Sequence, residues 1–202
     1  MRAHDWDRKW RERLEHHHAE VSGQANRFLV AEIEGREPGR ALDLACGAGR
    51  NAVWLAERGW RVTGVDFSAV ALDEARNLAA DRHVTVEWVE GDVLEWEPPA
   101  ESFELVLVLY LQVPSGERRL VLEHASHALV SGGSLLVMGH HSDNLSDGWG
   151  GPSNPRVLYT AEELASDIVA LDVERAERVL RPVATDDGEQ TAIDALVIAT
   201  AP

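Results

Sequence analysis

The sequence predicts an α/β fold in which a mostly parallel β-sheet is connected by crossover helices. Three observations support this prediction. Short apolar runs rich in Val and Leu alternate with amphipathic helical patterns, as they do in βαβ units. Gly and Pro residues with turn-forming character separate these runs. The chain has 202 residues, 45% of them hydrophobic, which suffices for one buried core, so we expect a single domain over residues 1–202.

The expected elements follow from the spacing of the apolar residues. Strands are expected at about 40–45, 60–66, 84–89, 103–110 and 132–140, with helices between them at about 50–58, 68–80 and 115–130. A later helix over 160–171 begins with Thr160 as N-cap and Glu163 three residues on, the spacing of a capping box. Two β-like runs then predict an antiparallel hairpin over residues 172–200.

Composition excludes several classes of protein. The formal net charge is −16, and a nucleic-acid or acidic-membrane surface needs clustered cations instead. The only cysteine, Cys46, has no partner for an internal disulfide, and the first residues lack the apolar core of a secretory signal. We therefore expect a cytoplasmic enzyme that acts on small molecules and binds neither membranes nor nucleic acids. A monomer and a homodimer both remain open.

A glycine turn after the first strand predicts a ligand site. In "ALDLACGAGRN" the strand runs into Gly47 and Gly49, and a helix begins near Arg50. Glycines allow the backbone to approach a ligand closely, because they have no Cβ. The unpaired N–H groups at the N-terminus of a helix favour an anionic group. The spacing to Ala52, together with Asp66 at the end of the second strand, also fits a dinucleotide fingerprint. The glycine turn alone therefore leaves an NAD(P)-binding oxidoreductase open.

Further polar residues distinguish a dinucleotide site from other kinds of ligand site. Asp43 lies inside the first strand, where dinucleotide sites usually have an apolar residue and where a carboxylate can accept a hydrogen bond from an ammonium group. Asp92 in "EGDV" follows the third strand and can reach the amine of a base. Tyr110 ends the fourth strand, "FELVLVLY", beside the expected cleft. The carboxylate at position 43 argues against a dinucleotide, because a pyrophosphate would be repelled there.

In order, "LDLACGAG", "VTGVDFS", "EGDV", "FELVLVLY" and "LVSGGSLLVMG" resemble the successive motifs of the class I S-adenosylmethionine-dependent methyltransferases. The resemblance implies a Rossmann-like three-layer α/β/α sandwich with a seven-stranded sheet of order 3-2-1-4-5-7-6 and an antiparallel last strand. It also implies that S-adenosyl-L-methionine binds across the carboxyl ends of the first, second and fourth strands, with S-adenosyl-L-homocysteine as the product.

The resemblance also implies which residues bind the cofactor. The turn from Ala45 to Gly49 lines the methionine moiety, Asp66 holds the ribose hydroxyls and Phe67 covers the adenine. Asp92 and Val93 flank the adenine. The complete set of expected cofactor-binding residues is Trp6, Trp10, Asp43, Ala45, Cys46, Gly47, Gly49, Arg50, Asp66, Phe67, Ser68, Asp92, Val93 and Leu109.

The stretch "GRNAVWLAERGWRVTGVDFS" shows a narrower resemblance. It is similar to the group of thiopurine and tellurite-resistance methyltransferases. Members of this group methylate soft sulfur, selenium or tellurium nucleophiles. Trp6 and Trp10 lie four residues apart and share one face of a helix. The resemblance implies that this helix, within an N-terminal helical cover over residues 1–30, folds over the cofactor.

The chemistry itself requires few groups. Methyl transfer is an in-line displacement, so a general base is needed only by acceptors that lose a proton. Candidates for a catalytic role are Tyr110, His140 and His141, all near strand carboxyl ends. The two histidines point to opposite faces if the strand continues, so at most one faces the ligand. The Gly- and Asn-rich segment 141–159 is expected to be a lid loop, with Trp149 and Tyr159 as acceptor contacts.

No metal site is expected. Adjacent histidines at 16–18 cannot converge on one ion, and the pair His124 and His127 lacks a third ligand. Cys46 is expected to pack against the sheet rather than to react. The sequence therefore favours an S-adenosylmethionine-dependent methyltransferase of a small molecule. The alternatives are an NAD(P)-dependent oxidoreductase and a non-catalytic module that binds S-adenosylmethionine.

Overall fold

The protein is represented by a computed structural model that describes residues 6–8, 10–12, 24–185 and 187–202. Most of the expected N-terminal cover, including the three adjacent histidines at 16–18, lies outside these residues. The chain forms two compact units. The first comprises Met1–Glu97 with Phe103–Leu105, and the second comprises Pro98–Ser102 with Val106–Pro202.

The strands form a seven-stranded sheet of order β3-β2-β1-β4-β5-β7-β6, as the resemblance implied. β1 pairs with β2 and β2 with β3 in parallel, whereas β7 is antiparallel to both β5 and β6. The strands are β1 (Arg40–Leu44), β2 (Arg61–Asp66), β3 (Glu87–Glu90), β4 (Phe103–Leu109), β5 (Leu129–His140), β6 (Asp172–Thr185) and β7 (Gly188–Thr200). β4 contributes residues to both units.

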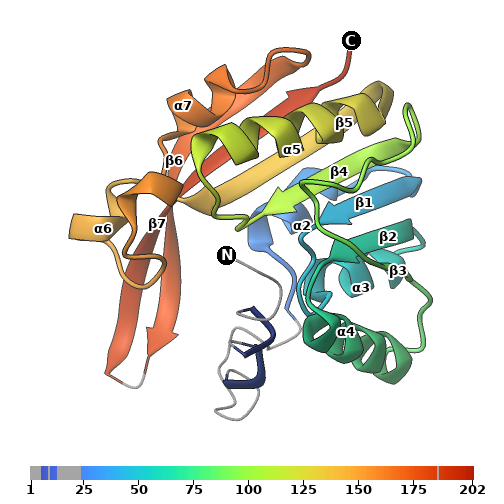
Figure 1. Ribbon diagram of the computed structural model, residues 1–202, viewed down its shortest axis with the longest axis horizontal. Helices are drawn as coiled ribbons and strands as arrows, with labels where there is room; N and C mark the ends of the chain where they lie inside the picture. The colour runs from blue at the N-terminus through green and yellow to red at the C-terminus, as the bar shows by residue number, and fades with distance from the viewer. Residues whose placement is uncertain (1–5, 9, 13–23, 186) are drawn as a thin grey trace. The chain divides into compact units, whose positions relative to one another are not determined.

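In the first unit, helices cover the strands that carry the glycine turn (Figure 1). These helices are α2 (Arg27–Ile33), α3 (Arg50–Ala56) and α4 (Ala69–Asp81). α3 packs on β1 and β2, and α4 packs on β2 and β3. The Ser68 hydroxyl caps α4 by accepting the N–H of Ala71. The amide of Asn26 caps α2, and its backbone N–H donates to Asn51 Oδ1 at 2.9 Å, which ties α2 to α3.

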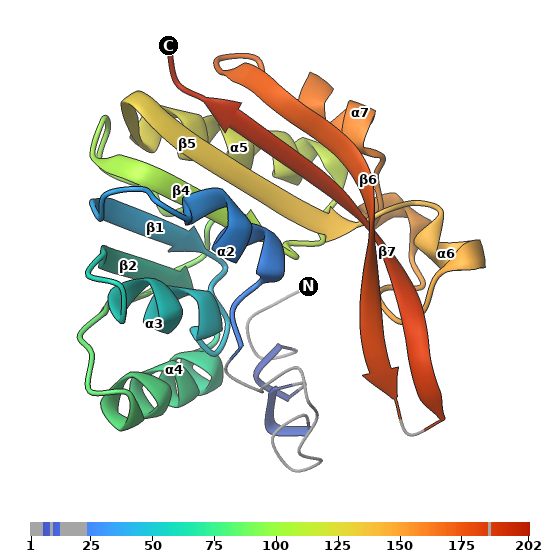
Figure 2. The same ribbon diagram turned by 180° about the vertical axis from the view of Figure 1, so that it is seen from behind.

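In the second unit, α5 (Ser115–Ala128) packs on β5, and α7 (Ala161–Ser166) packs on β6 and β7. Both helices lie on the same face of these strands (Figures 1 and 2). A buried ion pair joins them, because Arg118 Nε donates to Asp167 Oδ2 at 2.8 Å and both side chains are almost fully covered. The predicted capping box at the start of α7 is confirmed.

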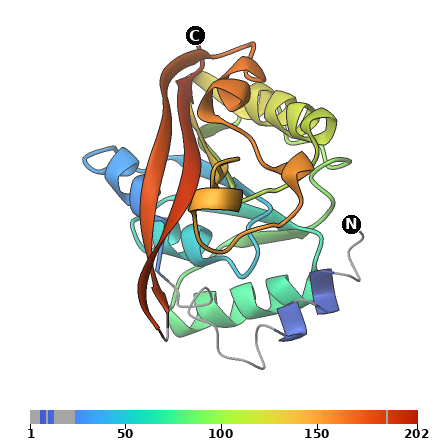
Figure 3. The same ribbon diagram turned by 90° about the vertical axis from the view of Figure 1, so that its left-hand side faces the viewer.

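The hairpin of β6 and β7 is longer than the strand beside it. β7 pairs with β5 only through Asp194–Thr200, whereas its pairing with β6 continues to Gly188. The far part of the hairpin therefore extends past the end of β5, as Figures 2 and 3 show. Asp194 and His140 form the last residue pair between β5 and β7.

The structure differs from the sequence prediction at several boundaries. β5 begins at Leu129, directly after α5, because Gly132 and Gly133 do not form a turn but bond to the backbone of Ala201. α7 ends at Ser166, five residues before the predicted end at 171. Segment 141–159 is not an irregular loop throughout, since it contains α6 (Asn144–Asp147) and the short 3-10 helix η2 (Pro155–Val157).

Within the part of the chain that the structure describes, no helix combines the length and the apolar character needed to cross a membrane.

Candidate functional site

The turn after β1 depends on backbone conformations that favour glycine. Ala45, Gly47 and Gly49 all have positive φ, at 59°, 55° and 75°. A Cβ on Gly49 would lie 2.5 Å from Trp88 Cη2, so only glycine allows the turn to pack against the indole from β3. A Cβ on Gly47 would lie 2.9 Å from the Trp10 ring. Both glycines of the turn thus allow a tryptophan ring to pack directly against the backbone.

Asp66 links this turn to the start of α4. Its Oδ2 accepts the N–H of Gly47 at 2.8 Å, and its Oδ1 accepts the N–H of Ser68 at 2.9 Å. Burial raises the pKa of this carboxyl, while hydrogen bonds from the backbone N–H groups of Ser68, Gly47 and Phe67 act in the opposite direction. Asp66 therefore shapes both loops and does not point into solvent.

Asp43 has an unusual environment within β1. Its side chain is 1% exposed, and burial raises its pKa to about 7, with the positive charge of Arg50 opposing the shift and the negative charge of Asp66 adding to it. Asp43 Oδ2 has no hydrogen-bond donor among the described residues. A buried carboxylate oxygen without a donor costs free energy unless a ligand or water satisfies it. This unsatisfied oxygen fits a ligand that carries an ammonium group.

The other predicted cofactor residues are placed as follows. Phe67 and Asp92 are half-buried, and Asp92 Oδ1 accepts the N–H of Leu94 at 3.0 Å. Val93 and Leu109 are buried. Cys46 is also buried, and burial together with the nearby carboxylates raises its thiol pKa, so the thiol stays protonated. Arg50 begins α3 and is half-buried.

The helix at residues 6–8 and 10–12 contacts the glycine turn within the first unit. Ser68 Oγ donates to Asp7 Oδ1 at 2.6 Å, and the ring of Trp10 lies against Gly47. Trp6 is half-buried. Of the predicted N-terminal cover, Asp7 and Trp10 thus contact Ser68 and the glycine turn, while residues 1–5, 9 and 13–23 lie outside the described part.

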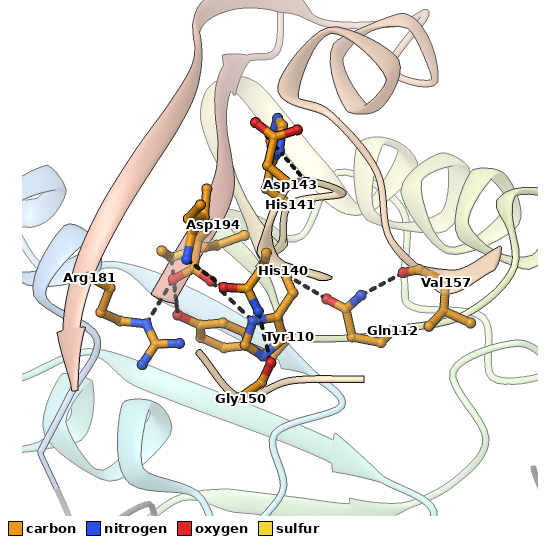
Figure 4. Close-up of polar contacts among 12 residues, drawn as sticks. Tyr110, Gln112, His140, His141, Asp143, Gly150, Val157, Arg181 and Asp194 are labelled. Atoms are coloured by element: carbon orange, nitrogen blue, oxygen red, sulfur yellow. Dashed lines mark hydrogen bonds and ion pairs between the residues drawn. The ribbon is translucent and has the colours of Figure 1, made fainter. Parts of the chain in front are cut away.

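A cluster of polar side chains gathers around Asp194 in the second unit (Figure 4). The Tyr110 hydroxyl donates to Asp194 Oδ2 at 2.9 Å, and Arg181 Nε donates to the same oxygen at 2.7 Å. His140 Nδ1 lies 3.3 Å from Asp194 Oδ1. We call Tyr110, His140, Arg181 and Asp194 the Asp194 cluster. Its members come from the end of β4, from β5, from β6 and from β7.

Asp194 is fully buried within the apolar part of β7, between Ile193 and Ala195. Burial raises the pKa of its carboxyl, but the neighbouring His140 and Arg181 outweigh it and keep the pKa below its ordinary value. The carboxylate is therefore charged, and the Arg181 guanidinium compensates this charge. A buried charge with this many partners is costly to assemble, so its position at the carboxyl ends of β4 and β5 favours a functional role.

The two adjacent histidines have different roles. The backbone N–H of His140 donates to Gln112 Oε1 at 2.7 Å, and its ring faces the Asp194 cluster. His141 is buried, and its Nδ1 accepts the N–H of Asp143 at 3.1 Å, which orders the start of segment 141–159. The rings point to different sides, as Figure 4 shows, so only His140 belongs to the cluster.

The aromatic residues of segment 141–159 also differ from each other. Tyr159 is 1% exposed, with its hydroxyl against the backbone of Gly139, whereas Trp149 is 45% exposed. Tyr159 therefore anchors the segment in the core, and burial raises its pKa. Of these two residues, only Trp149 is accessible to a ligand.

Sequence reasoning missed three residues of this region, namely Gln112, Arg181 and Asp194. Asp194 did leave a signal, since it is the only charged residue in the apolar run "TAIDALVIAT". Arg181 and Gln112 left none, because their contacts depend on the register of the hairpin and on the path of the chain after β4.

The second unit also contains a groove of about 730 Å³ between α5 and the residues that follow α7. Arg119, His127, Asp167 and Val169 are among its lining residues. None of the predicted catalytic or cofactor residues lines it, so we do not assign it to the reaction.

Comparisons with known proteins agree with this geometry. Residues 41–133 match the family described as methyltransferase domain. The ribosomal RNA small subunit methyltransferase C of Alcanivorax borkumensis is 36% identical over 73 residues, 35% of this chain and 22% of that protein. The trans-aconitate 2-methyltransferase of Paracidovorax citrulli is 32% identical over 138 residues, 66% of this chain and 50% of that protein. The chain thus spans half or less of the length of these relatives.

Solved structures share the fold. One, described as "Conversion of a Disulfide Bond into a Thioacetal Group during Echinomycin Biosynthesis", superposes with a TM-score of 0.73 at 22% identity and covers 89% of this chain and 82% of that chain. TehB from Haemophilus influenzae superposes with a TM-score of 0.72 at 15% identity over 88% of this chain and 62% of that chain. Residues 41–133 are therefore similar to a methyltransferase domain, and the chain shares the fold of these solved structures.

Proposed function

We propose that this protein is an S-adenosylmethionine-dependent methyltransferase that acts on a small-molecule acceptor. The observation that carries the proposal is the pairing of a glycine turn with the buried, unsatisfied Oδ2 of Asp43, within residues that match the methyltransferase domain. An NAD(P)-dependent oxidoreductase has no comparable use for a carboxylate at this position.

The residues of the first unit fit the cofactor of this class. Asp43 would accept a hydrogen bond from the amino group, Gly47 would lie against the methionine chain, and Asp66 would bind the ribose hydroxyls beside its backbone contacts. Phe67, Ser68, Asp92 and Val93 would surround the nucleoside. When bound, S-adenosylmethionine supplies a methyl group on a sulfonium that a nucleophile can displace in line.

The acceptor is proposed to be a small molecule. The net charge of −16 opposes a phosphate backbone as substrate, and the trans-aconitate relative has a small-molecule acceptor in its name. The fold shared with TehB supports, more weakly, the idea of a soft sulfur, selenium or tellurium acceptor. We also propose that the enzyme acts in the cytoplasm, as its single cysteine suggests.

Tyr110 and His140 are the proposed groups that contact the acceptor. Each stands at the carboxyl end of its strand, where open α/β sheets bind ligands. His141 is a weaker candidate, since its Nδ1 is engaged by the backbone of Asp143.

Calorimetric titration with S-adenosylmethionine and S-adenosylhomocysteine tests the proposal. We expect saturable binding of both, and weakened binding by Asp66→Asn, while the exposed Asp81→Asn serves as the matched control. Titration with NADH and NADPH should give no heat. Binding of a dinucleotide in place of the two sulfur nucleosides would refute the assignment. Binding without turnover of thiols, selenite, tellurite, phenols and amines would indicate a non-catalytic module.

A further inference from the structure

One hydrogen bond near Asp194 remains to be assigned, between its Oδ1 and Nδ1 of His140. Oδ2 already accepts from the Tyr110 hydroxyl and from Arg181 Nε. Within the part of the chain that the structure describes, the buried Asp194 Oδ1 has no well-aligned donor, and the buried His140 Nδ1 has no well-aligned partner. These two atoms are 3.3 Å apart. Each is therefore the nearest available partner for the other.

The proton between them can have only one position in a neutral ring. If Nδ1 carried its lone pair, two electron-rich atoms would face each other in a buried site, which is strongly unfavourable. A proton on Nδ1 instead gives Asp194 Oδ1 a charge-assisted hydrogen bond. The ring then carries its lone pair on Nε2, and Nε2 becomes the basic atom of His140.

The surroundings hold the ring in this orientation. The backbone N–H of His140 is fixed by Gln112 Oε1. The Tyr110 ring lies 5.3 Å from the imidazole at an interplanar angle of 52°, and a Cβ on Gly151 would lie 2.9 Å from His140 Cγ. The backbone of segment 141–159 thus packs directly on the ring and restricts its rotation, and the hydrogen bond to Asp194 selects the orientation with Nδ1 toward the carboxylate.

We propose that Asp194 is a positioning residue that fixes the Nδ1–H tautomer of His140, so that Nε2 accepts a proton from the methyl acceptor. This inference rests on the proposed methyltransferase function. It selects acceptors that carry a dissociable proton, namely hydroxyl, thiol or N–H compounds, over carboxylates, which react without a base. A lone pair of the acceptor forms the new bond to carbon, the carbon–sulfur bond breaks with its electron pair on sulfur, and the acceptor proton moves to Nε2.

Nuclear magnetic resonance of protein labelled with ¹⁵N-histidine tests the tautomer without any substrate. The His140 signals are identified by their loss in His140→Gln. In the neutral ring we expect a protonated Nδ1 and an unprotonated Nε2, the opposite of the tautomer that imidazole side chains favour in water. A protonated Nε2 in the unmodified protein would overturn the proposal. Because this measurement needs no variant other than the one for assignment, a failure of another variant to fold does not affect it.

Substitutions then test the role of the carboxylate. Asp194→Asn presents an amide that can donate to Nδ1, so we expect the His140 proton to move to Nε2. Tyr110→Phe leaves Oδ1 in place and should keep the Nδ1–H tautomer. Glu174→Gln makes the same chemical change on the exposed side of the hairpin and should alter no His140 signal. An unchanged tautomer in a folded Asp194→Asn variant would contradict the inference.

Turnover assays separate this inference from the proposed function. With thiols, phenols and amines as acceptors, we expect Asp194→Asn to reduce kcat at least tenfold while S-adenosylmethionine affinity by calorimetry stays within twofold. Turnover confined to carboxylic acids, and insensitive to His140→Gln, would overturn the choice of acceptor. Absence of S-adenosylmethionine binding, with the Nδ1–H tautomer intact, would instead refute only the proposed function.

Discussion

At the scale of single residues, Asp43 is predicted to couple proton binding to ligand binding. Its pKa of about 7 means that the folded protein holds a proton on Asp43 at pH 6 that it loses by pH 8. Only the carboxylate attracts an ammonium group, so S-adenosylmethionine should bind about tenfold more tightly at pH 8 than at pH 6. Calorimetry at both pH values measures this ratio.

Asp43→Asn is the control for this pH dependence. The amino group of the ligand titrates equally with both proteins, so the contribution of Asp43 is the difference between their two pH profiles. We expect the Asn variant to lose most of the change between pH 6 and pH 8. Equal profiles for the two proteins would show that the ligand does not sense the charge of Asp43.

The same raised pKa affects folding. The unfolded chain releases the Asp43 proton near its ordinary pKa of 3.8, and the folded protein releases it only near 7. The folded state therefore binds more protons than the unfolded state over this range. The contribution of Asp43 to the free energy of unfolding falls as the pH rises from about 4 to about 7. Urea unfolding at pH 5 and pH 8 should show a smaller loss of stability for Asp43→Asn than for the unmodified protein.

Asp66 should contribute to cofactor binding both directly and through the loops. Asp66→Ala removes the acceptor for Gly47 N–H and Ser68 N–H as well as the proposed ribose contact. We expect S-adenosylmethionine affinity to fall by about 1 to 3 kcal/mol, the scale for hydrogen bonds to a charged acceptor. Calorimetry gives the affinity, and thermal unfolding of the variant shows whether the loops remain folded. Unchanged affinity would place the ribose elsewhere.

How far the sequence predicts the site depends on whether local spacing defines a residue's surroundings. Asp43, Gly47 and Asp66 belong to one strand–turn–helix–strand unit formed by β1, α3 and β2, so their spacing predicts their proximity. Asp194 and Arg181 meet across the hairpin of β6 and β7, and no local pattern specifies the register of that hairpin. His140 could be proposed from its strand-end position, but not its carboxylate partner.

At the scale of elements, the N-terminal helix is predicted to serve the cofactor site more than the core. Its described contacts with that site are Asp7 to Ser68 and Trp10 to Gly47. Deletion of residues 1–14 should leave a folded protein with weaker S-adenosylmethionine binding and poorer turnover. Circular dichroism and calorimetry on the same sample check both parts. A deletion variant that fails to fold would instead assign the Trp residues to the core.

Sequence patterns predicted the type of most elements better than their ends. The alternation of apolar runs gave β1, β2 and β4 to within one residue at each end, because these strands are buried and stop at clear polar or glycine residues. The start of β5 was wrong, since Gly132 and Gly133 suggested a turn although they bond to the chain end beyond β7. The helices in segment 141–159 are too short for periodicity to reveal them.

At the scale of the whole molecule, the expectation of one domain leads to a measurable result. Although the chain forms two compact units, β4 contributes residues to both of them. We therefore expect one cooperative thermal transition, with the same midpoint by circular dichroism and by fluorescence. S-adenosylmethionine at a hundred times its Kd should stabilise the protein by about 2.7 kcal/mol in that single transition. Two separate transitions, only one of which responds to the ligand, would contradict the one-domain expectation.

Asn144 restricts how segment 141–159 can rearrange. Its Oδ1 accepts the N–H of Ile193 in β7, and its Nδ2 donates to the carbonyl of Gly150 within the same segment. One amide therefore binds the segment to β7 and also links two parts of the segment. Hydrolysis of this amide to a carboxylate would remove the donor and place a negative charge beside the β7 backbone. Slow deamidation during storage would thus loosen the backbone that packs on the His140 ring, and an ageing preparation would lose acceptor turnover before it lost cofactor affinity.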